Sequence, residues 1–286
     1  MKVISISGGL GNQLFQYAFY LYLKDKSKFK DVFLDFSFYS NQSKRTAVIK
    51  NFHGINHIDI ANQSSYVRMK FFLLKFIGKF RFANNFFKFV DKEKGLDKTV
   101  LITSKMIFDG YWQSYEYAKN YRSHIKDLFG FYDFNGNVLD VKNMICKTNC
   151  ICMHVRRGDY ITESNASSVH GVCSELYYRD AFQHIYNADK SVECIFVFSD
   201  EIEWVKNNLS FEIPMIVVDF VGQDVPDYVE MLLFSHGKHK IISNSTFSWW
   251  GAFLSERSGL IVTPKKWFIN EEKIYDEIFI KGSVRL

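Results

Sequence analysis

The sequence predicts an α/β protein built from two doubly wound domains, and three observations lead to this prediction. A short apolar strand at residues 2–7 runs through a glycine turn into a helix-like segment. From residue 148 onward, apolar strands alternate with helices, as in a parallel sheet covered on both faces. Residues 1–147 carry 23 Lys+Arg against 12 Asp+Glu, whereas residues 148–286 carry 13 against 19. We therefore expect a basic domain over 1–147 and a second domain over 148–286, with the last segment as a candidate for packing back on the first.

Composition excludes several classes of protein. A chain of 286 residues that is 47% hydrophobic can bury a sizeable core, so global disorder is excluded. No run of 18 apolar residues is present, and the apolar run after Met1 is too short for a signal peptide. The five cysteines do not suggest a disulfide framework, and Cys150-x-Cys152 lacks the spacing of zinc ribbons. We expect a cytosolic protein with reduced thiols, no metal site and no nucleic-acid partner.

The glycine turn near the start offers free backbone amides at a helix N-terminus. Gly11 is followed by Asn12 and Gln13, whose carboxamides can bind a phosphate or sugar hydroxyls. Leu14 stands where a dinucleotide fingerprint has its third glycine, so the match to an NAD-binding turn is partial. Asp35, at the end of the next strand, lies near the position of a ribose-binding acid. Asn12 could alternatively cap the helix.

The rest of the first half is predicted from apolar runs and turn residues. Residues 36–65 are polar and loop-like. We expect a strand over 100–107, a helix over 115–129 and a turn-rich interdomain region over 133–137. The run Tyr111-Trp112-Gln113 is either a sugar-facing edge or a buried aromatic corner.

Residues 66–90 form a basic aromatic segment with six Lys/Arg, eight Phe and no acid. Two interpretations stay open. A helix of this kind can lie on an anionic membrane with its rings in the headgroup layer. Alternatively, one or two helices pack their Phe side chains into the core and leave the cations in solvent.

Polar side chains follow the first strand of the second half. The strand over 151–155 carries His154 and runs into Arg156 and Arg157. Adjacent guanidinium groups are poor core groups, because burying an unpaired cation is costly, but each can grip two phosphate oxygens. Ligands of open α/β sheets bind at the carboxyl ends of the strands. We therefore expect a phosphate site here; the alternative is a surface strand end whose arginines pair with Asp159.

Two further strands end in small polar residues. The strand over 193–198 runs into Ser199 and Asp200, which could cap the next helix or meet a ribose or a base. The strand over 240–243 opens into hydroxyl and amide side chains before a helix, namely Asn244, Ser245, Thr246 and Ser248. A helix start is a ready anion site, and capping explains only one of these hydroxyls. The other expected elements are helices over 175–188, 201–209 and 227–236 and strands over 215–218 and 261–263.

Four motifs occur in series along the chain: GGLGNQLFQYAF near the start, HVRRGDY at 154–160, FSDE at 198–201 and NSTFSWWGAFL at 244–254. In this order and at these spacings they resemble the α-1,2-fucosyltransferases of glycosyltransferase family 11. The resemblance implies a GT-B fold, in which two Rossmann-like domains face a cleft. It also implies inverting transfer of L-fucose from GDP-β-L-fucose to the 2-hydroxyl of a galactose.

The resemblance assigns roles to residues of these motifs. Arg156 grips the donor diphosphate, assisted by its neighbours. The residues implied in donor binding are His154, Arg156, Arg157, Ser199, Asp200, Asn244, Ser245, Thr246 and Ser248. The residues implied to face the cleft from the N-terminal domain are Gly11, Asn12 and Gln13. The acceptor hydroxyl must lose a proton, and Asp159 and Glu163 are the nearest carboxylates for that task, although Asp159 could instead orient an arginine.

Cofactors and partners follow from the same motifs. No Asp-x-Asp is present, so we expect two arginines and a helix N-terminus to take the place of a metal, with no cofactor and GDP-fucose as donor substrate. The expected acceptor is a galactose-terminated glycan of O-antigen type, with a lipid-linked form as one version. The expected location is cytoplasmic, with peripheral contact to the anionic inner membrane left open. Alternatives are another donor or linkage on the same fold, or a non-catalytic glycan-binding protein.

Overall fold

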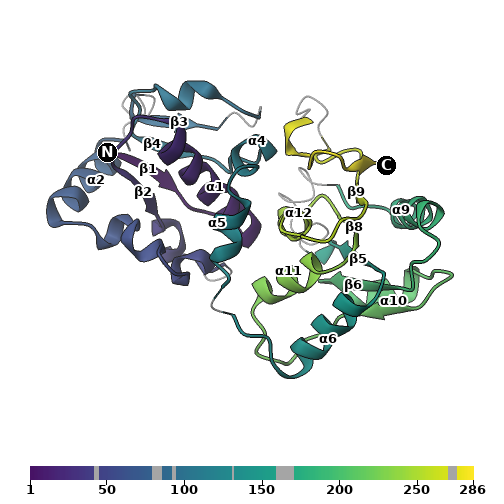
Figure 1. The fold of residues 1–286 in the computed structure, drawn as a ribbon. Helices are drawn as coiled ribbons and strands as arrows, with labels where there is room; N and C mark the ends of the chain where they lie inside the picture. The colour runs from purple at the N-terminus through teal and green to yellow at the C-terminus, as the bar shows by residue number, and fades with distance from the viewer. Residues whose placement is uncertain (42–44, 79–85, 92–94, 131, 159–170, 270–275) are drawn as a thin grey trace. The chain divides into compact units, whose positions relative to one another are not determined.

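Figure 1 shows the chain as a computed structural model that describes all residues except 42–44, 79–85, 92–94, 131, 159–170 and 270–275. The chain divides into two compact units, Met1–Phe131 with Tyr275–Ile278 and Tyr132–Ile274 with Phe279–Leu286. The division lies before residue 147, because α6 (Gly136–Lys147) belongs to the second unit. Both units are α/β with parallel sheets, as predicted. Within the described ranges, no helix is long and apolar enough to cross a membrane.

The sheet of the first unit has the order β2-β1-β4-β3, with every pair parallel. Its strands are β1 (Lys2–Ser5), β2 (Val32–Asp35), β3 (Lys88–Val90) and β4 (Ile107–Asp109). The helix α1 (Leu10–Lys26) follows β1, and most of its residues are buried, as in a helix with apolar residues on most of its circumference. The polar stretch before α2 (Ser65–Gly78) contains short 3₁₀ helices, namely η1 (Ser37–Asn41), η2 (Val48–Asn51), η3 (Ile55–His57) and η4 (Ile60–Asn62).

Two predictions for the first unit are wrong. The strand expected over 100–107 is instead the 3₁₀ helix η5 (Lys98–Leu101), because the Asp97 carboxylate accepts from the Thr99 N–H (2.9 Å) and starts a turn. The single helix expected over 115–129 is divided into α4 (Tyr115–Ala118) and α5 (Arg122–Asp127). The helix is interrupted before Tyr121, which is the N-cap residue of α5. The side chain of Tyr121 is buried, and its hydroxyl donates a hydrogen bond to the Asp25 carboxylate (2.9 Å).

The corner after β4 is a buried aromatic corner rather than a sugar-facing edge. Trp112 is 1% exposed, and its ring stacks on Phe19 with centroids 3.9 Å apart. Its backbone has φ +55°, a conformation that is rare for a bulky residue, and its N–H donates to Asp91 (2.8 Å). The adjacent Gln113 donates to the carboxamide oxygen of Asn12 (2.8 Å), which ties the corner to α1.

A segment near the C-terminus completes the first unit. The 3₁₀ helix η6 (Asp276–Ile278) lies in that unit, far in sequence from the rest of it. The Glu277 carboxylate accepts from the Leu96 N–H and from the Ser114 hydroxyl (3.2 Å). These bonds tie the segment to the loop before η5 and to the N-cap residue of α4.

The second unit has a six-stranded parallel sheet with the order β10-β9-β8-β5-β6-β7. The strands are β5 (Cys150–Val155), β6 (Cys194–Ser199), β7 (Met215–Val217), β8 (His239–Ile241), β9 (Ile261–Thr263) and β10 (Val284–Arg285). The chain passes from β5 to β6 and β7 on one side, then returns to place β8 and β9 on the other side of β5. The strand order therefore reverses between β5 and β8, which is where ligands bind in open α/β sheets.

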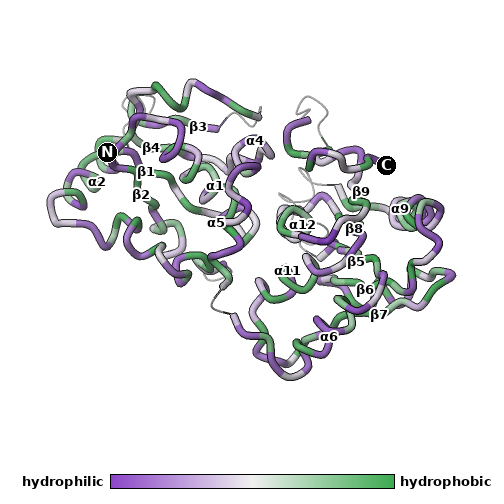
Figure 2. The backbone as a smooth tube through the Cα atoms, viewed as in Figure 1, coloured by the Kyte–Doolittle hydropathy of each residue, from purple (hydrophilic) through white to green (hydrophobic). Residues whose placement is uncertain are grey.

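Helices connect these strands close to the predicted positions. They are α9 (Glu175–Ala188), α10 (Ile202–Asn208), α11 (Asp227–Ser235) and α12 (Thr246–Phe253), besides α6. All six residues of β5 are buried, which explains why this strand reads as a continuous apolar run. Figure 2 shows the same hydrophobic character along β5 and β6 at the centre of the sheet.

Candidate functional site

The candidate site lies at the carboxyl edge of the second-unit sheet, where the strand order reverses. β5 ends at Val155 and delivers Arg156, while β8 is followed by Ser243 and the start of α12. A hydrogen bond between His154 Nδ1 and Ser243 Oγ (2.9 Å) joins the two strand ends. The polar strand ends predicted from the sequence are thus brought together at one edge.

The Asp200 carboxylate, at the end of β6, holds the arginine loop in place. It accepts from the backbone N–H groups of Arg157 and Gly158 (both 3.0 Å), and it lies 3.2 Å from Arg156 Nη1. A Cβ atom at Gly158 would lie 2.9 Å from an Asp200 carboxylate oxygen, so a larger residue there would push this carboxylate away from the loop. The other polar group of this strand end, the Ser199 hydroxyl, accepts from the Glu201 N–H (2.9 Å). Asp200 therefore positions Arg156 from a neighbouring strand.

The two arginines have different surroundings. The guanidinium of Arg157 lies 3.9 Å from the centre of the Trp204 ring on α10, a cation–π contact. The side chain of Arg156 is 34% exposed and pairs with Asp200. Arg156 is therefore an oriented cation that solvent, and hence a ligand, can reach at the edge of the sheet.

His154 is buried behind the strand ends. It is 5% exposed, stacks on Phe247 with centroids 5.3 Å apart and meets the edge of Phe234. Burial, with a smaller contribution from Arg156, lowers the pKa of His154 to about 3, so the ring is neutral near pH 7. His154 therefore helps to position the ends of β5 and β8 relative to each other.

The residues of the NSTFS run divide into two groups. Asn244 is 3% exposed and donates to the carbonyls of Gly171 (2.7 Å) and Trp267 (3.3 Å). Ser248 is fully buried, and its hydroxyl lies 3.1 Å from the Ser245 carbonyl. These two side chains therefore hold backbone segments together.

Ser245 and Thr246 form the other group. Ser245 is the N-cap residue of α12 without a side-chain capping bond, and Thr246 is the first residue of the helix. Among the described residues, none hydrogen-bonds to either hydroxyl. These hydroxyls and the amides of the first turn are what the motif offers to an anion.

The structure corrects the role expected for the glycine turn of the first unit. Gln13 is fully buried, and its carboxamide donates to the carbonyls of Gly8 (3.1 Å) and Thr46 (2.9 Å). Gly11 is buried as well, and only Asn12 of the three is partly exposed. Asn12 does not cap α1, because Gly9 is the N-cap residue.

Three acidic residues that the sequence suggested for the site remain to be placed. The Asp35 carboxylate forms an ion pair with Lys75 (2.9 Å) and accepts from the Ser37 hydroxyl (2.9 Å), so it is not poised as a ribose-binding acid. Both candidates for the catalytic base, Asp159 and Glu163, lie outside the described residues.

The sequence interpretation missed Glu230, a carboxyl in the first turn of α11. Burial, followed by the charges of Asp227 and Asp219, raises the pKa of Glu230 to about 7. It lies one helical turn before Phe234, whose ring meets those of His154 and Phe198 (centroids 6.3 and 5.6 Å). An acid directly flanked by the apolar residues Val229 and Met231 is the signal that could have drawn attention to it.

This raised pKa predicts a pH-dependent stability. The folded chain holds the Glu230 proton up to about pH 7 while the unfolded chain loses it near its ordinary value of 4.5, so stability falls as pH rises between them. Glu230→Gln removes this loss. We expect it to raise the free energy of unfolding relative to wild type by about 2–3 kcal/mol more at pH 8 than at pH 5. Urea unfolding at both pH values measures this difference.

The exposed Glu212 provides a matched control for Glu230. Glu212→Gln should not change the pH dependence of unfolding, because water solvates that carboxylate. Equal pH profiles for wild type and Glu230→Gln would contradict the burial of Glu230.

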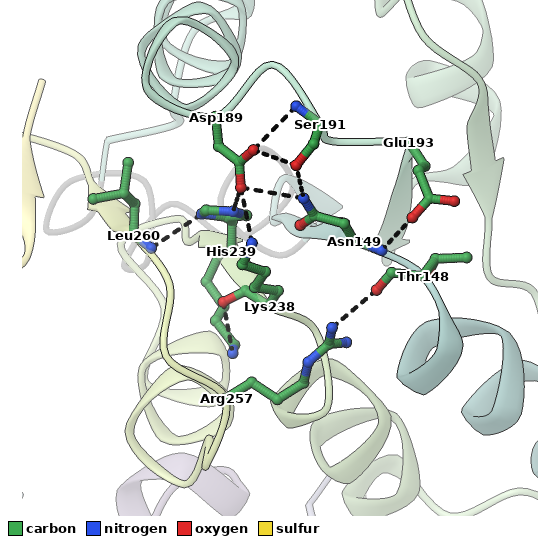
Figure 3. Close-up of polar contacts among 10 residues, drawn as sticks. Thr148, Asn149, Asp189, Ser191, Glu193, Lys238, His239, Arg257 and Leu260 are labelled. Atoms are coloured by element: carbon green, nitrogen blue, oxygen red, sulfur yellow. Dashed lines mark hydrogen bonds and ion pairs between the residues drawn. The ribbon is translucent and has the colours of Figure 1, made fainter.

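The amino edge of the same sheet is also polar, but its groups are engaged with one another (Figure 3). The Asp189 carboxylate accepts from Lys238 Nζ (2.8 Å), Asn149 (3.1 Å), Ser191 (2.6 Å from the hydroxyl) and His239 Nε2 (3.2 Å). The Lys238 and Ser191 bonds, first among these, hold the pKa of Asp189 well below its usual range. His239 Nδ1 accepts from a backbone N–H (3.1 Å), which fixes the ring with its proton on Nε2. This edge is a structural network.

Comparison with known proteins identifies the family of the chain. The sequence model described as Glycosyl transferase family 11 matches residues 1–283. The chain is 30% identical over 274 residues to an alpha-1,2-colitosyltransferase of Escherichia coli, covering 94% of this chain and 93% of that protein. It is also 30% identical over 291 residues to the O-antigen biosynthesis glycosyltransferase WbnK of Escherichia coli, covering 94% and 95%.

More distant similarity extends to other glycosyltransferases. A galactoside alpha-(1,2)-fucosyltransferase 1 of Leontocebus fuscicollis is 27% identical over 103 residues, 36% of this chain and 28% of that protein. Among solved structures, a family 9 glycosyl transferase of Veillonella parvula gives a TM-score of 0.49 at 10% identity, covering 99% of this chain and 86% of that one. The family match spans almost the whole chain and includes all four motifs, so the chain belongs to glycosyltransferase family 11 and is a glycosyltransferase.

Proposed function

We propose that the chain is an inverting α-1,2-fucosyltransferase that moves L-fucose from GDP-β-L-fucose to the 2-hydroxyl of a galactose in a surface glycan. The observation that carries this proposal is the convergence of Arg156 and the start of α12 where the strand order reverses. An oriented guanidinium and a helix N-terminus are suited to a diphosphate. The names of the family 11 relatives support an α-1,2 linkage and an O-antigen type of acceptor.

The proposed chemistry assigns the developing charge to Arg156 and α12. Cleavage of the sugar–phosphate bond leaves the GDP with additional negative charge, which oriented donors stabilise. Arg156, held by Asp200, and the amides that follow Ser245 supply these donors without a metal or cofactor. The acceptor hydroxyl attacks from the opposite face of the sugar, and we propose Asp159 or Glu163 as the base that takes its proton.

Colitose is the second candidate for the donor sugar, because one relative is an alpha-1,2-colitosyltransferase. Colitose is fucose without its 3-hydroxyl, so both sugars would fit the same diphosphate site. A GDP-release assay with GDP-fucose, GDP-colitose and GDP-mannose decides between them, using galactose-terminated acceptors with and without EDTA. Acceptor-dependent release from GDP-fucose that survives EDTA supports the proposal. Release from GDP-colitose alone, or activity lost to EDTA, contradicts the donor or the metal-free mechanism, respectively.

The position of Asp200 gives a prediction about turnover. Asp200→Ala leaves both arginines in the chain but removes the acceptor that fixes their loop, so Arg156 loses its orientation. We expect kcat/KM for the donor to fall about 10- to 100-fold. Initial rates of GDP release measure this change, and the exposed Asp180→Ala on α9 is the control that should keep wild-type rates. Unchanged rates in Asp200→Ala would show that the loop needs no such support.

A further inference from the structure

The helix α2 of the first unit buries only a small part of its apolar surface. It packs on the unit through Phe71 and Leu74, each 7% exposed, and Phe71 joins Val3 and Ile60 in a core cluster. Six other large apolar side chains are between 40% and 68% exposed, namely Tyr66, Met69, Phe72, Leu73, Phe76 and Ile77. Packing into the core therefore involves Val67, Phe71 and Leu74, and most of the large apolar side chains of this helix stay exposed.

The exposed apolar side chains of α2 form one continuous face. At about 100° per residue they span an arc of roughly 140°, opposite Phe71 and Leu74. Arg68 borders this arc on one side and Lys70 borders it on the other, and both are exposed. Lys75 lies outside the arc, where it pairs with Asp35. The helix contains no acid, so the apolar face has a purely cationic rim.

We propose that the exposed face of α2 lies on an anionic lipid surface, with the helix axis parallel to the bilayer. The rings and aliphatic side chains of the arc enter the boundary between headgroups and acyl chains, as in amphipathic interfacial helices. Arg68 and Lys70 then reach anionic headgroups on both sides of the helix. This contact does not depend on the identity of the sugar donor.

The cationic rim favours a lipid surface over a second copy of the chain. In a two-fold dimer through this face, the same arc would meet itself. The rims of both copies would then come together, and α2 offers no acid to pair with them. An anionic bilayer replaces this repulsion with attraction.

Flotation of the full chain with lipid vesicles tests the proposal. We expect binding to vesicles of phosphatidylcholine with about one third phosphatidylglycerol, weaker binding to phosphatidylcholine alone, and a decrease with added salt. Phe72→Ser with Phe76→Ser should lower the partition coefficient at least about tenfold, because it removes ring burial. Arg68→Ser with Lys70→Ser should lower it roughly tenfold on anionic vesicles only.

Matched substitutions elsewhere provide the controls for flotation. Ile102→Ser with Leu176→Ser removes side chains that are 86% and 65% exposed, and Lys28→Ser with Lys147→Ser removes two exposed cations; both pairs should float like wild type. Loss of binding in either control, or full binding in the Phe72/Phe76 variant, overturns the proposal. A wild-type dimer that becomes a monomer in the Phe72/Phe76 variant would assign the face to a second copy. Donor turnover with a soluble acceptor should stay unchanged in all variants, which separates this test from that of the proposed function.

Discussion

Arg156→Ala is expected to lower kcat/KM for GDP-fucose about a thousandfold. The substitution removes the exposed cation at the point where the strand order reverses, and no other described side chain pairs with Asp200 in its place. Removal of a donor that stabilises developing charge costs this much in transferases and hydrolases. Arg156→Lys keeps the charge but loses the two-pronged grip, so we expect an intermediate loss of about 10- to 100-fold. Initial rates of GDP release with a saturating acceptor measure both.

Two further variants make this result specific. Arg179→Ala removes an exposed arginine that pairs with Glu175 on α9, and its rates should match wild type. If Asp200 acts through Arg156, the double variant Arg156→Ala/Asp200→Ala should be no slower than Arg156→Ala alone. Additive losses would instead mean that Asp200 has a role of its own, and wild-type rates in Arg156→Ala would remove the basis of the proposed mechanism.

The second large effect concerns stability. Trp250→Ala should lower the free energy of unfolding by about 3–5 kcal/mol, because it empties a large buried site. Trp250 is fully buried, and its ring meets those of Trp249 and Phe253 (centroids 4.9 and 5.4 Å). Next to it, a Cβ at Gly251 would lie 2.7 Å from the Phe234 ring, so α12 and α11 are already in close contact and cannot collapse into the void.

Urea unfolding at fixed pH measures the stability change in Trp250→Ala. Tyr66→Ala removes an aromatic side chain that is 67% exposed and should change the free energy of unfolding by less than about 0.5 kcal/mol. A comparably small change in Trp250→Ala would show that α12 is not packed as the structure has it. The NSTFSWWGAFL motif thus combines the polar groups proposed to bind the donor at its start with core packing in its second half.

The second unit could be predicted well because its elements are local and strongly patterned. Each central strand is buried on both faces and reads as an apolar run, and α9 and β9 have the predicted bounds. The first unit was harder. Gln13 bonds to backbone groups more than 30 positions away, so nothing local distinguishes it from an exposed amide. The 3₁₀ turn at Lys98–Leu101 likewise depends on a single aspartate rather than on periodicity.

The location of the candidate site could be predicted, but the direction of its side chains could not. Strand ends in a parallel sheet meet at one edge, so the arginine run and the NSTFS run had to come together. The partner of each polar side chain depends on tertiary contacts, which the local sequence does not reveal. Ser248 faces its own helix start, whereas Asp200 reaches the arginine loop from 42 or 43 positions away. Glu230 was missed because burial, which shifts its pKa, is a tertiary property.

The return of η6 to the first unit has a consequence for the order in which the chain matures during synthesis. Domains near the N-terminus ordinarily finish folding while later ones are still being made. Here the Leu96 N–H can meet its partner, Glu277, only after the intervening strands of the second unit have been made. The first unit therefore cannot complete its hydrogen bonding before β5, β6, β7, β8 and β9 of the second unit have been synthesised.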